Sequence, residues 1–245
     1  MEKTNGANIS LKTDNSVVDA LFSVGAHFGF VKSRRHPSTK PFIFGVKNKI
    51  EIFDLEKTSE SLNKALEFVQ ELGTKNAKIL FVSGKNEAKS AIVKYAENIN
   101  MPYVAGRFIG GTLTNFPEIR KRVEKLETLV SQKEKGELVK YTKKERLLID
   151  REIDKLHEFF FFFFFMKNLP VALFVIDSKK ESIAVKEAKK MGIPVISLSG
   201  TDNNLNEVDF PIPGNDASRM SIEFFLQKIA DAYKVGQLKK PTATV

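Results

Sequence analysis

The chain has 245 residues, of which 42% are hydrophobic, so it is long enough to bury a substantial core. Lys and Arg outnumber Asp and Glu by 39 to 30, and the resulting net charge of +9 favours a polyanionic partner without proving one. The absence of Cys excludes disulfides, thiolate metal sites and a cysteine nucleophile, and it suits a reducing compartment.

No targeting or membrane segment is expected. Residues 1–13 carry polar and charged side chains but lack the apolar stretch of a secretory signal. The most apolar run, 159–166, is too short to span a bilayer. The sequence therefore predicts a soluble, cytoplasmic protein.

Short β-rich runs alternate with amphipathic helices along most of the chain. Strands are predicted at 42–44, 50–53, 77–82, 102–104, 171–176 and 193–198. Helices are predicted at 59–72, 87–98, 181–191 and 218–233. Gly73 is expected to end the first of these helices. The alternation predicts an α/β fold of the flavodoxin or Rossmann-like kind, with helices on both faces of a parallel sheet.

The alternation is interrupted by a predicted helical hairpin. The spacing of capping boxes occurs at two predicted helix starts, in Asn115 with Glu118 and in Thr142 with Glu145. Gly136 is expected to interrupt the helical pattern between the two helices. The apolar stripe consists of Ile119, Val123, Leu126, Val130, Ile149, Ile153 and Leu156. Its spacing is that of a coiled-coil seam. Between 118 and 158 there are twelve Lys or Arg and ten Asp or Glu, so these charges are interpreted as a solvated surface.

These patterns divide the chain into three parts. An α/β domain takes in 1–106 and 166–235, the coiled-coil hairpin is an insertion at 107–165, and 236–245 form a flexible C-terminal tail. Seven consecutive Phe occupy 159–165, where neither a helix nor a strand could hide them all from water. Two interpretations stay open: a plug covered by a partner, or a run that arose by gene slippage or by an error in the recorded sequence.

Two features resemble phosphate-binding loops only superficially. Gly84-Lys85 follows a predicted buried strand, but the first Gly of a P-loop is missing and Asn86 replaces its Ser or Thr. Gly106, Gly110 and Gly111 do not have the dinucleotide-binding spacing either. A strand-to-helix turn with a solvated Lys85 is the favoured interpretation.

Other candidate catalytic groups are weak. Asp177 and Asp202 lie just beyond apolar strands, where α/β enzymes gather their ligands, but such residues are more often turn or cap residues. The histidines are His27, His36 and His157. They have neither metal-ligand spacing nor a paired nucleophile motif. No catalytic residue, metal or cofactor is expected, although an α/β enzyme acting on a nucleotide or sugar phosphate remains the alternative.

Residues 31–50 carry six Lys or Arg and no acidic side chain. Pro37 and Pro41 oppose a helix, so an extended loop is predicted. Such a loop can neutralise several phosphates, with Arg side chains binding them bidentately. From charge alone, a merely solvated basic loop is an equal alternative.

Several blocks of sequence occur in the order and spacing of a known family. They are 25–29 (GAHFG), 40–45 (KPFIFG), 52–58 (IFDLEKT), 101–104 (MPYV), 107–116 (RFIGGTLTNF), 142–145 (TKKE), 173–177 (LFVID), 192–195 (GIPV) and 209–216 (DFPIPGND), together with Arg34 and Pro37. Spread over 17–235, they resemble bacterial ribosomal protein S2 of the small subunit. The most distinctive is the block that Arg107 opens.

The resemblance implies an α/β domain with a protruding coiled-coil hairpin and a structural, non-enzymatic role in translation. It also implies a place near the head–body junction of a cytoplasmic ribosome (an organellar one is not excluded), in contact with ribosomal RNA and neighbouring proteins, and a part in docking ribosomal protein S1. The predicted RNA-binding residues are Lys32, Arg34, Arg35, His36, Lys40, Lys47, Lys49 and Arg107. Arg107 could instead be a packing or capping residue.

The sequence departs from the family pattern at three places. Phe30 stands where a second His is usual, and Arg35-His36-Pro37-Ser38 replaces a more typical Trp-Asn-Pro-Lys. The Phe run replaces a Gly-containing turn. RNA contacts of the basic segment are therefore expected to differ in detail from those of the family.

Overall fold

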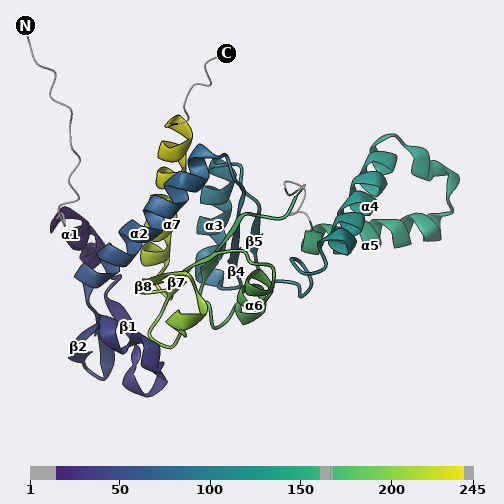
Figure 1. The fold of residues 1–245 in the computed structure, drawn as a ribbon. Helices are drawn as coiled ribbons and strands as arrows, with labels where there is room; N and C mark the ends of the chain where they lie inside the picture. The colour runs from purple at the N-terminus through teal and green to yellow at the C-terminus, as the bar shows by residue number, and fades with distance from the viewer. Residues whose placement is uncertain (1–14, 161–165, 167, 240–245) are drawn as a thin grey trace, which may run out of the picture.

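Five parallel strands form the central sheet of the computed structural model, which describes residues 15–160, 166 and 168–239 (Figure 1). They are β4 (Ile79–Ser83), β5 (Tyr103–Ala105), β6 (Ala172–Ile176), β7 (Val195–Ser199) and β8 (Phe210–Pro213), in the order β5-β4-β6-β7-β8. Every residue of β4, β5, β6 and β7 is buried. Strands covered on both faces need such continuous apolar runs, and the predicted α/β fold is confirmed.

Helices cover both faces of this sheet. One core cluster packs α2 (Leu55–Thr74), α3 (Asn86–Asn98) and α7 (Arg219–Leu238) against one face, with α1 (Asn15–Ser23) beside α2. A second cluster packs α6 (Ser182–Lys190) against the other face. Ile119 and Val123, at the start of the predicted hairpin, also belong to this second cluster. The hairpin therefore begins inside the core of the α/β domain.

The prediction that Gly73 ends a helix is wrong. Gly73 is buried inside α2, where α7 crosses it at Gly236. A Cβ on Gly73 would collide with the carbonyl oxygen of Tyr233, and one on Gly236 would collide with the carbonyl oxygen of Gln70. The glycine serves close helix packing rather than termination, and α7 runs to Leu238, beyond the residue where the tail was expected to begin.

The basic segment is part of a small antiparallel sheet and not the extended loop that was predicted. Its strands β1 (Phe28–Val31), β2 (Ile43–Lys47) and β3 (Ile50–Phe53) have the order β1-β3-β2. Two 3₁₀ turns, η1 (Lys32–Arg34) and η2 (Pro37–Phe42), join β1 to β2. Pro37 is tolerated at the first position of η2 because its missing N–H has no intrahelical partner there.

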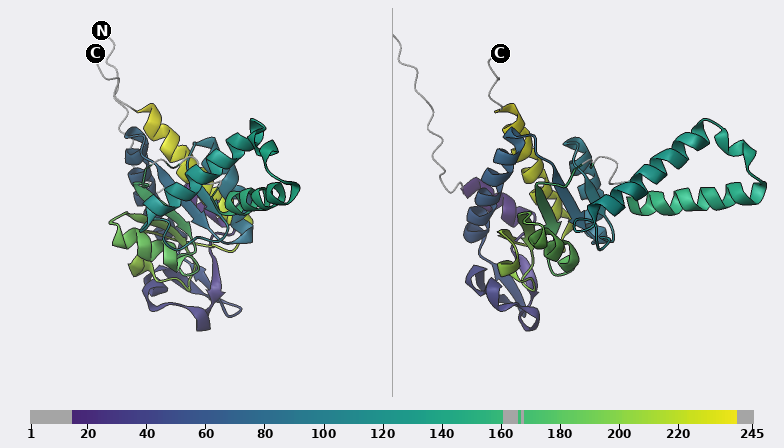
Figure 2. Two further views of the ribbon diagram at one scale, coloured as in Figure 1. Left: turned by 90° about the vertical axis from the view of Figure 1, so that its right-hand side faces the viewer. Right: turned by 45° about the vertical axis from the view of Figure 1, so that its right-hand side comes forward.

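The hairpin is formed by α4 (Phe116–Glu134) and α5 (Lys143–Phe160), joined through η3 (Glu137–Lys140), and it projects from the α/β domain (Figure 2). The second capping box is confirmed, since the Thr142 N–H donates to Glu145 Oε2 at 2.9 Å. The first is wrong: with ψ at 41°, the Asn115 side chain accepts no capping bond, and its backbone carbonyl accepts from Glu118 and Ile119 instead.

Residues 161–165 of the Phe run lie outside the described residues, so neither interpretation of the run is tested. Within 15–160, 166 and 168–239, no helix has both the length and the apolar character needed to cross a membrane.

Candidate nucleic-acid interface

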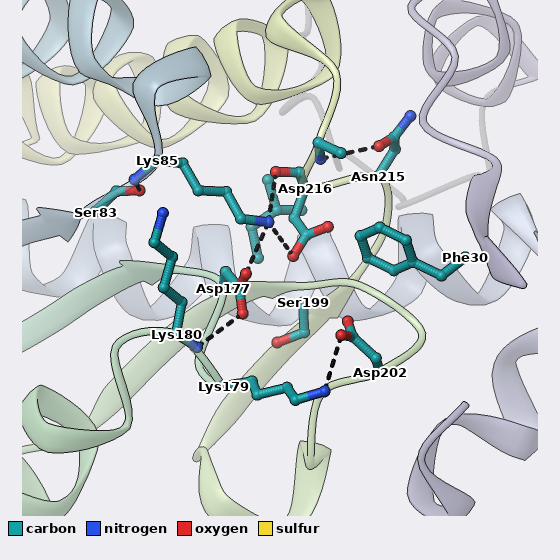
Figure 3. Close-up of polar contacts among 12 residues, drawn as sticks. Phe30, Ser83, Lys85, Asp177, Lys179, Lys180, Ser199, Asp202, Asn215 and Asp216 are labelled. Atoms are coloured by element: carbon teal, nitrogen blue, oxygen red, sulfur yellow. Dashed lines mark hydrogen bonds and ion pairs between the residues drawn. The ribbon is translucent and has the colours of Figure 1, made fainter. Parts of the chain in front are cut away.

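The carboxyl edge of the parallel sheet is closed by ion pairs between β4 and β6, where the strand order reverses (Figure 3). In open α/β sheets this reversal marks the usual ligand crevice. Here Lys85 Nζ lies 2.8 Å from Asp177 Oδ2 and 2.9 Å from Asp216 Oδ2, and it also donates to the Asp216 carbonyl at 3.0 Å. The expectation of a solvated Lys85 is therefore wrong, because its ammonium occupies the crevice.

Burial and charge act against each other in this cluster. Burial alone would lower the pKa of Lys85, but the charges and hydrogen bonds of Asp216 and Asp177 outweigh it and raise the pKa. Burial raises the pKa of Asp216 to about 6, and the attraction of Lys85 offsets only part of that effect. Asp177 also makes the expected turn, since its Oδ1 accepts from the Lys180 N–H at 3.0 Å.

Two backbone sites that could bind a phosphate already bind carboxylates of this chain. The Gly84 N–H donates to Glu181 Oε1 at 2.7 Å. In the Gly-rich block, the N–H groups of Gly111, Leu113 and Thr114 all donate to the Glu187 carboxylate. Because these donors are used internally, neither glycine-containing loop is arranged to hold a nucleotide.

Two of the predicted RNA-binding arginines are held in ion pairs. Arg34 Nη2 lies 3.2 Å from Asp202 Oδ2, and its guanidinium sits 4.6 Å from the centre of the Phe30 ring. Arg35 Nη1 lies 3.0 Å from Oε1 of Glu51, a fully buried carboxylate. Arg34 thereby ties the small sheet to the loop after β7, and Arg35 ties η1 to β3.

The four lysines of the basic segment have no such partner. They are Lys32, Lys40, Lys47 and Lys49. All four are exposed, and none makes an ion pair with another described residue. His36 is half-buried, and its Nδ1 lies 2.8 Å from Ser38 Oγ. The lysines are free to meet phosphates, whereas His36 has a local capping role.

A shallow cavity of about 450 Å³ lies between the basic segment and α6. Arg34, Arg35 and His36 line one side, and Lys179 and Lys186 line the other. Sequence reasoning missed the two lysines because they lie about 150 residues further along the chain, and only their positions after β6 and on α6 bring them close. Asp202 and Glu207 also line this basic groove. Asp202 Oδ2 lies 3.1 Å from Lys179 Nζ as well as close to Arg34, so among the Lys and Arg side chains that line the groove, only Lys186 makes no ion pair with a described residue.

Arg107 lies away from this groove, at the base of the hairpin. The structure therefore does not bring the eight predicted residues into one site. Within the described residues, no group of three or more His, Asp or Glu is placed to hold a metal ion.

Comparison with known proteins identifies similar chains along almost the whole length. A family model described as ribosomal protein S2 matches residues 21–236. Small ribosomal subunit protein uS2 of a Nitratiruptor species is 42% identical over 217 residues, which cover 89% of this chain and 81% of that protein. The uS2 protein of Hahella chejuensis is 43% identical over 212 residues, covering 86% and 84%.

Proposed function

This chain belongs to the ribosomal protein S2 family, and from that membership we propose that it is a structural component of the small ribosomal subunit that binds ribosomal RNA. The observation that carries this proposal is the family match across residues 21–236, which includes both sheets and the hairpin. We further propose the position near the head–body junction, contacts with neighbouring small-subunit proteins, and a part in docking ribosomal protein S1.

Charge and exposure support the basic segment as an RNA contact. Lys32 and Lys40 flank the basic groove in sequence, and Lys47 and Lys49 sit at the turn between β2 and β3. Exposed lysines with no carboxylate partner can neutralise phosphates without first breaking an internal ion pair. Arg34 and Arg35, by contrast, are proposed to shape the groove.

The enzyme alternative finds no support in this geometry. An α/β enzyme for nucleotides or sugar phosphates needs an accessible crevice at the strand-order reversal. That place is filled by Lys85 with Asp177 and Asp216, and the neighbouring N–H donor of Gly84 is bonded to Glu181. Calorimetric titration with ATP, GTP or NAD is expected to detect no binding; a dissociation constant of about 1 μM would restore the enzyme alternative.

The RNA contact is tested by the salt dependence of binding to small-subunit ribosomal RNA made in vitro. Replacing Lys32, Lys40, Lys47 and Lys49 with Ala should lower the slope of log affinity against log salt by up to ~3.6, at ~0.9 per lost phosphate contact. The matched control removes four exposed lysines from other elements: Lys64, Lys75, Lys89 and Lys190. Equal effects of the two variants would contradict a specific role for the basic segment.

A further inference from the structure

A second and larger cavity, of about 710 Å³, lies at the base of the hairpin. Arg107 comes from the Gly-rich block, Arg122 from α4, and Arg151 and Lys155 from α5. Among the described residues that line it, Glu152 is the only carboxylate, beside these four cations. The sequence alone does not predict this cluster of cations, because the hairpin as a whole is nearly neutral. In addition, Arg122 and Arg151 belong to different helices and are far apart in the sequence.

The four cations make no ion pair or side-chain hydrogen bond with any described residue. The other cations of α4 are paired: Arg120 binds Glu124, Lys121 binds Glu118 and Lys133 binds Asp150. Lys125 is paired as well, with Glu152, which reduces the negative charge that Glu152 offers the cavity. The hairpin thus neutralises these neighbours and leaves the cavity positively charged.

Apolar side chains line the same cavity. Ile183 of α6 is 55% exposed, and Ile109 and Leu156 are partly buried in the second core cluster. A cavity lined by both cations and aliphatic side chains suits a ligand that has an anionic part and a planar apolar part. A nucleotide whose base has left its stack has this character.

We propose that the cavity at the hairpin base binds an unstacked nucleotide of ribosomal RNA together with its flanking phosphates, an inference that rests on the RNA-binding function proposed above. Arg107, Arg122 and Arg151 bind the phosphates, because a guanidinium fork matches two phosphate oxygens. Lys155 adds a point charge, and the base packs against Ile183. The cavity is separate from the basic groove, so the protein contacts RNA on both sides of α6.

The test removes one cavity cation from each helix of the hairpin and compares this double variant with a control double variant. Arg122→Gln with Arg151→Gln is measured against Lys121→Gln with Lys144→Gln, two exposed lysines of the same helices that do not line the cavity. Binding of in vitro transcribed small-subunit ribosomal RNA is followed over a salt series. The salt slope should fall by ~1.4 for the cavity pair, at ~0.7 per contact to a single strand, and should stay unchanged for the control.

Equal slopes for the two pairs would overturn the cavity assignment while leaving the proposed function intact. Failure of the unaltered protein to bind the RNA at all would instead overturn the proposed function. Thermal melting of both variants establishes that they are folded, and the single change Lys155→Gln, at an exposed side chain, repeats the test with half the expected effect.

A photo-crosslinking experiment distinguishes RNA from protein as the molecule that occupies the cavity. Ile183 is exposed, so a benzophenone amino acid can replace it with little loss of packing. In isolated small subunits, this group should crosslink to a nucleotide of ribosomal RNA. A crosslink to a protein would show that an acidic protein segment, and not RNA, occupies the cavity.

Discussion

Arg35 Nη1 lies 3.0 Å from Oε1 of Glu51, whose side chain has no solvent exposure. The Glu51 carboxylate is on β3, in the middle of the small sheet, and its Oε2 atom has no hydrogen-bond partner among the described residues. A buried carboxylate in this position needs its one counter-charge. An arginine from a segment that looked like a simple phosphate-binding loop is therefore part of that segment's own framework.

Arg35→Ala is expected to lower the free energy of unfolding by about 3 kcal/mol, because it leaves the buried carboxylate of Glu51 without its ion-pair partner. Lys32→Ala and Lys47→Ala remove equally basic side chains that are exposed and unpaired, and each should change stability by less than about 0.5 kcal/mol. Urea unfolding of the three variants provides the comparison. Similar stability for all three would mean that the Arg35–Glu51 pair contributes nothing to the fold.

Gly236→Ala is expected to destabilise the protein by about 1–3 kcal/mol, because the new methyl group would collide with the Gln70 carbonyl where α2 and α7 cross. Gly45→Ala is the control, since nothing lies within 4 Å of a Cβ built there. Thermal unfolding should show a lower Tm for Gly236→Ala only. An unchanged Tm for Gly236→Ala would contradict the close crossing.

Glu187→Gln should loosen the base of the hairpin, because an uncharged amide accepts more weakly than the carboxylate that binds three backbone N–H groups. Amide hydrogen exchange at Gly111, Leu113 and Thr114 is expected to accelerate at least tenfold, which corresponds to about 1.4 kcal/mol. The amides of β4 in the same sample serve as the reference. Unchanged exchange in the Gly-rich block would show that Glu187 does not hold it.

Asp216 should give the stability a distinct pH dependence. The pKa of Asp216 is about 6 in the folded protein, whereas the ordinary value for an aspartate, taken for the unfolded chain, is 3.8. Between these two pH values the folded protein therefore binds more protons than the unfolded chain. The contribution of Asp216 to the free energy of unfolding therefore falls as pH rises through this window. Other groups that act on the carboxylate are Lys85, Asp177 and Asp202.

Comparison with Asp216→Asn, which cannot titrate, isolates this effect. As pH is lowered from 7 to 4, the wild type should gain stability relative to the variant, by up to roughly 3 kcal/mol for a shift of about two pKa units. A constant difference between the two proteins over this range, measured by urea unfolding, would argue against the raised pKa.

The sequence was sufficient for the parts of the fold that depend on local pattern. Residues such as Phe81 and Phe174 lie in continuous apolar runs, and such runs identify the buried parallel strands without knowledge of their neighbours. Gly73 was misread because its meaning depends on Gly236, which is distant in sequence and meets it only when α2 and α7 pack. A glycine near the end of a periodic pattern is compatible with either role.

The candidate interface was only partly predictable for the same reason. Charge density identified the basic segment, but charge alone could not separate exposed Lys47 from Arg35, whose partner lies on a strand. The packing of the helices determines that Lys186 lies in the basic groove and that Arg122 and Arg151 line the same cavity. The local sequence around a residue does not indicate which side chains from distant segments will lie beside it.

Sedimentation of a cell extract through a sucrose gradient tests the central claim most directly. If the protein is a structural component of the small ribosomal subunit, the native chain should migrate with small-subunit particles in roughly equal stoichiometry with their RNA. Its release should require high salt, since phosphate contacts weaken as counterions compete for them. Native, folded protein found only at the top of the gradient, with small subunits complete without it, would contradict the assignment.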